Sequence, residues 1–389
     1  MILEDREARY YLQRDLSEKY SLPIIVVRVN YPGNKNNKIV NSAFKFINLE
    51  LTYLYKKLIN KSEGPVLVGV VNMDPLVLKR LAIDIEENHP LGRMFDIDVY
   101  DKSFNQVPRS ALGLEPRTCI ICGENAHSCI RSLSHTLDEV RDTYNKLFIN
   151  HISNIMGKYA KESLLEELEL SPKPGLVTPT SKGAHQDMDY DLFKRSIASI
   201  DFHELAEASF VSFVDAKRAG MLLEKKMFKA TKGVNTHKGG IYLLGTLIYS
   251  FIYSIMNDLD YQESIMKVSE NATDLYKRAD YSSHGKSVFI KYGSKGVLVD
   301  SEKGFPLIFK NLHLSGENLL RKLMGECEDT TILHRHGLDM LEYVQQLSNS
   351  SISLEEMNNL FTQKNISPGG SADLYAGVVF VNKLKGLFL

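Results

Sequence analysis

The chain has 389 residues, of which 43% are hydrophobic and 24% charged, and its formal net charge is −1 at pH 7. This length allows two or three domains with substantial cores, and the composition excludes a largely disordered chain. Because the net charge is near zero, neither nucleic acid nor a membrane is expected as a partner, and local clusters must hold any anionic substrate. Four cysteines are too few for a disulfide framework in a chain of this size.

The expected compartment follows from two segments. The first residues, MILEDR, do not form a basic stretch followed by an apolar one, so no signal peptide is predicted. The most apolar run, residues 241–256, is too short and too rich in Ser, Thr and Tyr for a membrane-spanning helix. We therefore interpret this run as a buried core helix and expect a cytoplasmic protein.

The first 150 residues mix helix and strand patterns. Residues 1–20 predict a charged amphipathic helix, and residues 22–33, LPIIVVRVNYPG, predict a strand that ends in a Pro-Gly turn. Residues 64–74 predict a second, buried strand, followed by a helix over residues 75–88. Residues 94–101 alternate apolar and acidic side chains like a third strand. The pattern predicts an α+β domain over residues 1–150.

Helical periodicity dominates after about residue 150, and strand signals nearly vanish. The pattern predicts a second, mostly α-helical domain over residues 151–389. Its predicted helical segments are residues 152–169, 190–230, 236–257, 260–280, 315–325, 336–348 and 370–386.

An acidic pair in residues 89–101, HPLGRMFDIDVYD, is the sharpest chemical feature of the first domain. Asp96 and Asp98 point to the same face of a strand because side chains alternate with period two. Two such carboxylates repel unless a cation lies between them, and Mg²⁺ with substrate phosphates meets that need. Gly92 allows close backbone approach to a phosphate, and Arg93 supplies a bidentate donor. The alternative is a strand with a solvated acidic face.

A cysteine and histidine cluster raises the question of zinc. The spacing is C-x2-C-x4-H-x-C, whereas a zinc knuckle has four residues before its last cysteine, so the match is imperfect. The candidate ligands are Cys119, Cys122, His127 and Cys129. Reduced structural thiols are one alternative. Phosphate contacts are another, made by Arg117, His127 and Arg131.

These motifs carry a resemblance to a known family. The runs VLKRLAIDIEENHPLGRMFDIDVYD and RSALGLEPRTCIICGENAHSCIRSLSH, with REAR at residues 6–9 and NYPGNKNN at residues 30–37, resemble the citrate lyase holo-acyl-carrier-protein synthase family. The resemblance implies a nucleotidyltransferase-like domain. It also implies transfer of a phosphoribosyl-dephospho-CoA unit to a serine of the apo-citrate lyase acyl carrier subunit, with pyrophosphate leaving.

Three glycine-bearing junctions stand out in the second domain, each leading towards a helix: residues 173–189, 232–240 and 367–375. Helix N-termini bind anions through free N–H groups, and His237 and Lys238 would add positive charge there. Asp187 and Asp189 could share a metal ion, and Asp189 could instead act as a general base. The alternatives are plain: Ser371 as N-cap and Asp373 in the first turn of a helix, core histidines at 185 and 237, and a simple Pro-Gly turn.

The same runs resemble the triphosphoribosyl-dephospho-CoA synthase family over residues 152–389. They are LSPKPGLV with GAHQDMD, RAGMLLEKKMFKATKGVNTHKGGIYLLG, SHG with GFP, and ISPGGSADL. The resemblance implies that the ribose 2′-hydroxyl of dephospho-CoA displaces adenine at the anomeric carbon of ATP, so that the triphosphate stays attached. This chain departs from the family at Thr178, where an acidic residue is common, and in residues 296–300, where an arginine is missing.

The chemistry assigns candidate residues to this reaction. The triphosphate needs a metal and cationic donors, the attacking hydroxyl needs a carboxylate base, and the oxocarbenium-like carbon benefits from a nearby carboxylate. The base candidates are Asp187, Asp189 and Asp373. The substrate-binding candidates are Lys173, His185, Glu224, Asn235, His237, Lys238, Gly369, Gly370 and Ser371.

The two resemblances together predict a bifunctional transferase. One domain would make the activated prosthetic-group precursor from ATP and dephospho-CoA, and the other would attach it to the carrier, with Mg²⁺ expected and Zn²⁺ as a second candidate. Fusion would raise the effective concentration of the shared intermediate. Two alternatives stay open: the equivalent system of malonate decarboxylase, and a non-catalytic zinc-binding interaction module in the first half.

Overall fold

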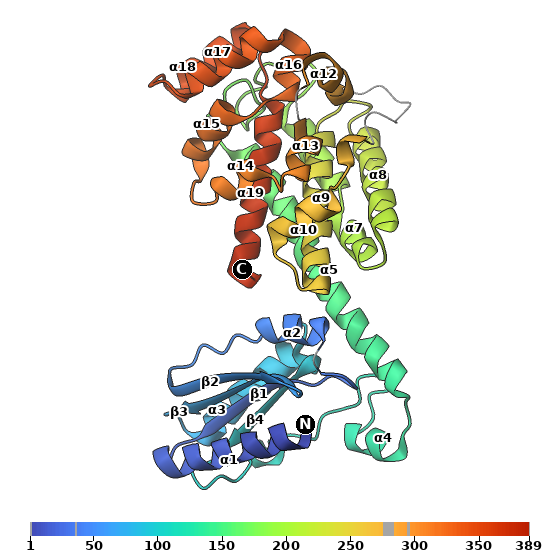
Figure 1. Cartoon of the computed structure of the whole chain (residues 1–389), viewed down its shortest axis with the longest axis vertical. Coiled ribbons are helices and arrows are strands. Elements are labelled where there is room, and N and C mark those ends of the chain that lie inside the picture. Colours follow the sequence, from blue (N-terminus) through green and yellow to red (C-terminus); the bar gives the residue numbers. More distant parts are fainter. Residues whose placement is uncertain (1, 36, 275–283, 294–295, 389) are drawn as a thin grey trace. The chain divides into compact units, whose positions relative to one another are not determined.

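The computed structural model describes residues 2–35, 37–274, 284–293 and 296–388. Residues 275–280 of the predicted helix over 260–280, Ser283 of the Ser-His-Gly motif and Asn36 lie outside the described residues. The chain divides into two compact units, residues 1–151 and 152–389 (Figure 1). Helix α5, Leu137–Glu169, contains the boundary between them.

The first unit is built on a four-stranded antiparallel sheet with the strand order β2-β3-β1-β4, so the α+β prediction is confirmed. Its strands are β1 Ile24–Val29, β2 Tyr53–Lys61, β3 Gly64–Val71 and β4 Phe95–Tyr100. Its helices are α1 Ile2–Tyr20, α2 Lys38–Lys45, α3 Pro75–Asn88, α4 Ala126–Ser132 and the first part of α5, with 3-10 turns η1 Gly92–Met94 and η2 Arg109–Leu112.

Strand β2 was not predicted, and its position explains why. It lies at the edge of the sheet, and its sequence YLYKKLINK has no buried residue. Lysines on an edge strand discourage pairing with other chains, and they also hide the alternation that identifies a strand.

The two faces of the sheet differ. On one face Ile24 and Val26 of β1 pack with Leu16 of α1, which lies along the sheet in Figure 1. On the other face, the buried residues Phe95, Ile97 and Val99 of β4 alternate with half-buried polar ones, and α3 packs against this strand. The predicted alternation of β4 is confirmed, and it places Asp96 and Asp98 on the same face as α1.

The second unit is mostly helical, as predicted. The region 190–230 forms three helices, and several short helices after residue 296 were not predicted. The helices that follow α5 are α6 Tyr190–Ser199, α7 Phe202–Ser209, α8 Phe213–Ala230, α9 Lys238–Asn257, α10 Tyr261–Val268, α12 His284–Tyr292, α13 Gly296–Glu302, α14 Pro306–Lys310, α15 Gly316–Glu326, α16 Thr330–His336, α17 Leu338–Ser348, α18 Leu354–Gln363 and α19 Gly369–Phe388.

Helix α9 is the central helix of this unit and contacts α7, α8, α10 and α19. It is longer than the expected apolar run, and by length and composition alone it could cross a membrane, so the argument from length was wrong. In the structure 61% of its most apolar window is buried, including Leu244, Ile248 and Phe251. That packing supports its interpretation as a core helix of this unit.

Candidate functional site

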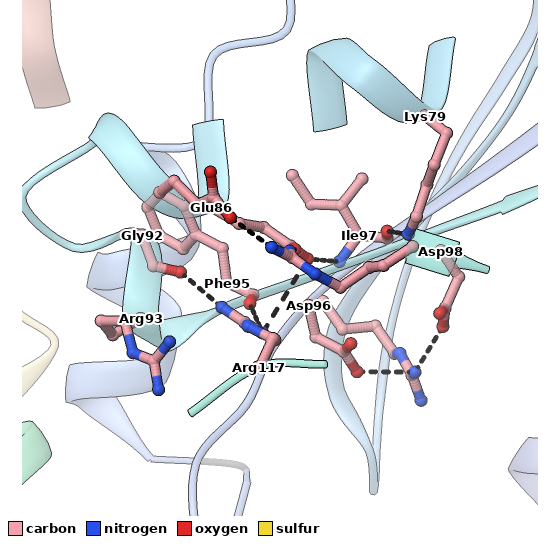
Figure 2. A network of polar contacts seen from close by, with 12 residues as sticks. Lys79, Glu86, Gly92, Arg93, Phe95, Asp96, Ile97, Asp98 and Arg117 are labelled. Atoms are coloured by element: carbon pink, nitrogen blue, oxygen red, sulfur yellow. Dashed lines mark hydrogen bonds and ion pairs between the residues drawn. The ribbon is translucent and has the colours of Figure 1, made fainter. Parts of the chain in front are cut away.

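Asp96 and Asp98 share a protein cation. The Nη2 atom of Arg28, on the neighbouring strand β1, donates to Oδ2 of Asp96 and to Oδ2 of Asp98, both at 2.7 Å (Figure 2). Asp98 also accepts from Gln106 through Oδ1 at 2.7 Å. The guanidinium therefore balances the carboxylate pair, a role that the sequence alone had suggested for Mg²⁺.

Further charges surround this pair on the same face. Arg6 and Arg9 of α1 both bond to Glu63, a residue at the turn between β2 and β3 that is only 8% exposed. The charges of Arg28, Asp96, Arg6 and Glu63 all act on Lys35, whose pKa is lowered by burial first and by Arg28 next. The network thus joins four cations, Arg6, Arg9, Arg28 and Lys35, to the carboxylates of Glu63, Asp96 and Asp98. With one positive charge in excess, it can attract a phosphate group.

Gly92, Arg93 and Arg117 lie at the start of β4, and each has a structural contact. A Cβ on Gly92 would lie 2.5 Å from the backbone oxygen of Glu86, so the glycine permits close approach to the end of α3. Arg117 donates to the backbone oxygens of Phe95 and Gly92 at 2.9 and 3.1 Å (Figure 2). Arg93 donates to the backbone oxygen of Thr118. The predicted phosphate contacts of these three residues stay predictions. Close packing against α3 is by itself enough to explain why a glycine is at position 92.

The structure brings the three predicted cysteines together, but with a different histidine from the predicted His127. Ligand atoms of Cys119, Cys122, Cys129 and His135 lie within 4.8 Å of one another, and His127 is not part of the group. His127 is an exposed residue of α4, and its backbone oxygen accepts from Arg131. The reason is geometric: helix α4 directs His127 away from Cys129, whereas the left-handed Leu133 at its end turns the chain back towards the cysteines.

The three predicted junctions of the second unit come together. His185 Nε2 lies 2.9 Å from the hydroxyl of Ser367, and Gly175 packs so closely on Ile366 that a Cβ would lie 2.0 Å from its backbone oxygen. Asp373, at the start of α19, lies against Gly239 and Gly240 at the start of α9. His185 and Ser367 are 182 positions apart in the sequence. Distant segments thus form one site.

Lys173 and His237 lie inside this assembly, and neither is the free cationic donor that the sequence predicted. The side chain of Lys173 is 2% exposed, and its ammonium nitrogen lies 2.5 Å from Oε1 of Glu167. Burial and the charge of Lys173 lower the pKa of His237 to about 3. His237 is therefore neutral near pH 7, and the prediction that it adds positive charge for a polyphosphate is wrong. Its Nδ1 lies 2.7 Å from Ser196 Oγ, and its buried Nε2 has no hydrogen-bond partner in the described structure.

Asp373 is the most distinctive carboxyl group of the site. Burial and the charges of Glu167 and Asp329 raise its pKa well above the ordinary value, although the backbone N–H of Gly240 donates to it. A Cβ on Gly239 would lie 2.1 Å from Oδ2 of Asp373, so only glycine allows this approach. The N-terminus of α9 thus receives a carboxyl group from the protein itself.

The N-terminal turn of α19 repeats this arrangement. Helix α19 begins at Gly369, one residue before the predicted start, so Ser371 is in the first turn and is not the N-cap. The backbone N–H of Ser371 donates to Oδ2 of the buried Asp329 at 3.0 Å, and its hydroxyl lies 3.3 Å from the same atom. A Cβ on Gly370 would lie 3.2 Å from the Asp329 carboxylate, and Gly369 lies beside Thr331.

The remaining candidates lie around this centre. Asp189 is the N-cap of α6 and accepts from the N–H of Leu192, so its structural role is the one typical of that position. Asp187 is exposed, and its charge acts on His185, whose pKa is lowered mainly by burial.

The cationic end of α9 is more open. Lys238 is 43% exposed and lies 3.4 Å from Glu224, and its backbone N–H donates to Asn235. Thr178, where the family has an acid, is buried in a turn with Ser181.

Three important residues were not predicted. Arg28 is the only charged residue in the strand run IIVVRV, which is a signal that could have drawn attention to it. Glu167 occurs in a predicted helix, where nothing distinguishes it from its acidic neighbours. Asp329 starts a short helix in the sequence Asp-Thr-Thr, a capping signal that the longer periodic patterns obscured.

The two units match two different family models. The model of apo-citrate lyase phosphoribosyl-dephospho-CoA transferase matches residues 1–151. The model of ATP:dephospho-CoA triphosphoribosyl transferase matches residues 154–388.

Individual relatives share the whole organisation. Protein CitXG of Haemophilus influenzae is 31% identical over an alignment that covers 99% of this chain and 96% of the relative. Protein CitXG of Leuconostoc mesenteroides subsp. cremoris is 30% identical, with 99% and 97% covered. The 2-(5''-triphosphoribosyl)-3'-dephosphocoenzyme-A synthase of Haemophilus ducreyi is 28% identical and matches 67% of this chain.

Two transferase units, each with a polar site of its own, define a bifunctional transferase of prosthetic-group synthesis. The chain belongs to the CitXG family, in which both transferases form one polypeptide. It makes triphosphoribosyl-dephospho-CoA from ATP and dephospho-CoA, and it transfers the phosphoribosyl-dephospho-CoA group to the citrate lyase acyl carrier protein.

Proposed function

We propose that each reaction takes place at the polar site of one unit. Adenine displacement is assigned to the cluster around Asp373 in residues 152–389, and carrier loading to the network around Asp96 in residues 1–151. The observation that carries the first assignment is the meeting of two distant junctions, 232–240 and 367–375, at the carboxyl group of Asp373, while the third junction contacts Ile366 and Ser367. Burying polar residues from distant segments costs free energy, so their assembly favours a catalytic role over simple packing.

Asp373 is proposed as the general base of the first reaction. The 2′-hydroxyl oxygen of dephospho-CoA bonds to the anomeric carbon of ATP as the bond from that carbon to adenine breaks, and the hydroxyl proton must be accepted. A raised pKa makes a carboxylate a stronger base, and base catalysis contributes about 10²- to 10⁴-fold in rate. Because His237 is neutral, it does not add a second positive charge to that of the buried Lys173.

The triphosphate is assigned to exposed cations at the edge of the same site. The amide of Gly240 at the start of α9 already bonds to Asp373, so the helix end alone does not supply the anion site. Lys238, at 43% exposure, and the exposed Lys182 are the proposed phosphate donors. Mg²⁺, when bound with ATP, would neutralise part of the phosphate charge.

Asp96 is proposed as the Mg²⁺-holding carboxylate of the carrier-loading reaction. Among the described residues its Oδ1 accepts no hydrogen bond, whereas both oxygens of Asp98 are bonded. In this reaction the carrier serine oxygen bonds to the phosphorus nearest the ribose, and the bond to pyrophosphate breaks. Arg6, Arg9, Arg28 and Lys35 would attract the phosphates. The carrier is that of citrate lyase, which the match over residues 1–151 names.

The test separates the two reactions. The purified chain is first incubated with ATP, dephospho-CoA and Mg²⁺, and adenine release is measured. The apo-carrier of citrate lyase or that of malonate decarboxylase is then added, and its mass shift is measured. We expect Asp373→Asn to lose adenine release by at least about 10²-fold while it still loads the carrier from supplied precursor. Asp96→Asn should show the opposite pattern. Loss of both reactions in either variant, or of neither, would contradict the assignment, and loading of the malonate decarboxylase carrier would contradict the carrier assignment.

A further inference from the structure

The segment between η2 and the main part of α5 has no hydrophobic core of its own. None of residues 108–143, all of them described, is buried. The apolar side chains of Ile121, Ile130 and Leu133 are 39%, 70% and 83% exposed. A chain segment of fewer than about 40 residues without a core usually needs a disulfide, a metal or a partner to hold one conformation.

Cys119, Cys122, Cys129 and His135 form a group of potential metal ligands in this segment, and their ligand atoms all lie within 4.8 Å of one another. The Sγ atoms of Cys122 and Cys129 are 3.5 Å apart, and Nε2 of His135 is 3.4 Å from Sγ of Cys122. Tetrahedral zinc with Zn–S bonds of about 2.3 Å and a Zn–N bond of about 2.0 Å requires S···S edges of about 3.8 Å and S···N edges of about 3.6 Å. The cluster therefore has the dimensions of a four-ligand zinc site.

The local backbone supports the same chemistry. The N–H groups of Ile121 and Cys122 donate to the sulfur of Cys119, as they would to a metal-bound thiolate. Gly123, with φ +78°, reverses the chain after the second cysteine, and its N–H donates to the backbone oxygen of Cys119 at 3.0 Å. Cys129 and His135 then approach from the short helix α4 and the turn that follows it.

We infer that Cys119, Cys122, Cys129 and His135 bind one structural zinc ion, which orders residues 118–136. Three thiolates and one imidazole fill the tetrahedron, so no position is left for a catalytic water. The effect reaches the sheet, because Arg93 donates to the backbone oxygen of Thr118 and Arg117 donates to that of Phe95. The zinc thus holds the loop that positions both arginines at the start of β4. This inference concerns metal binding and does not rest on the assigned reactions.

The first test is the metal content of the full chain after purification under reducing conditions. We expect about one zinc per chain by elemental analysis, with X-ray absorption showing three sulfur neighbours at about 2.3 Å and one nitrogen at about 2.0 Å. The chain after removal of zinc should take up Co²⁺ with thiolate-to-metal charge-transfer bands. No bound zinc together with no Co²⁺ uptake would overturn the inference, as would a Cys122–Cys129 disulfide found by mass spectrometry in the reduced preparation.

Matched histidine variants test the ligand set. His135→Asn should lose the bound zinc, His135→Cys should keep it as a four-thiolate site, and His127→Asn should keep it unchanged. In the unaltered protein a chelator should release zinc and make three thiols reactive, while the buried Cys327 stays slow. Zinc retained in His135→Asn at the level of the unaltered chain, or lost in His127→Asn, would refute this ligand set.

Discussion

The buried ion pair of Lys173 and Glu167 gives the sharpest stability prediction. The Nζ–Oε1 distance is 2.5 Å, and the side chains are only 2% and 8% exposed. Nζ also donates to the backbone oxygen of Glu167 at 2.7 Å. When one partner of a buried pair is removed, an uncompensated charge stays in the interior at a cost of about 3–5 kcal/mol. Lys173→Met would leave Glu167 close enough to Asp373 for their charges to interact.

That free energy converts to a measurable shift in the melting temperature. The unit comprises residues 152–389, a size at which 1 kcal/mol corresponds to about 2–4 °C in Tm. We therefore expect Lys173→Met to lower the Tm of this unit by about 6–20 °C. Differential scanning calorimetry that resolves its transition measures the shift.

Two controls show whether burial is the cause. Lys310 is 60% exposed and lies 2.9 Å from Glu326, so Lys310→Met should cost no more than about 1 kcal/mol. The double variant Glu167→Gln/Lys173→Met removes both charges and should be more stable than the sum of the two single variants predicts. A Tm for Lys173→Met like that of Lys310→Met, or simple additivity in the double variant, would refute the reasoning.

Three further predictions concern the same sites. Gly239→Ala places a Cβ 2.1 Å from Asp373 and should destabilise its unit by about 1–3 kcal/mol in urea unfolding, whereas Gly220→Ala, whose Cβ meets its nearest atom at 3.6 Å, should not. Gly92→Ala should destabilise the first unit by a similar amount of about 1–3 kcal/mol, because its Cβ would lie 2.5 Å from a backbone oxygen of α3; unchanged unfolding would show that the loop can shift. Burial lowers the pKa of His237 from the ordinary 6.5 to about 3, so the unfolded chain takes up the proton first, and the contribution of this residue to stability is lost as the pH falls from 6.5 towards 3. Unfolding measured across that range should depend less on pH in His237→Gln than in the unaltered chain, and parallel curves would contradict this.

Local patterns in the sequence predicted the local structure well. The alternation in FDIDVY correctly places Asp96 and Asp98 on one face, because strand geometry depends on adjacent residues alone. The same pattern does not reveal Arg28, whose contact spans 68 positions and depends on which strands pair. Helical periodicity likewise predicts the region of α9 but not that Asp373 lies against its first turn.

The cysteine and histidine cluster shows the same limit at shorter range. Spacing drew attention to three cysteines that lie together in the structure, but the histidine predicted with them is not the one in the group, because proximity in sequence is not proximity in a folded loop. His127 is two residues from Cys129 but is not near its sulfur, while His135 is six residues away and belongs to the group. Leu133 has a left-handed backbone conformation and turns the chain so that His135 approaches the cysteines. A bulky apolar residue rarely adopts this conformation, so the sequence does not predict the turn.

The carboxylates of the second unit suggest why its site is built from helix ends. Asp373 bonds to the start of α9, and Asp329 bonds to the first turn of α19 and caps α16. A helix N-terminus stabilises the ionised form of such a carboxyl group by a few tenths to about 1 kcal/mol, which offsets part of the repulsion between neighbouring carboxylates. One buried lysine balances Glu167. Burial raises the pKa values of both Asp329 and Asp373, and the charges of Glu167 and Asp329 raise that of Asp373 further. This environment agrees with the proposed role of Asp373 as a general base, and the glycines of both helix starts allow the carboxyl groups to be placed there.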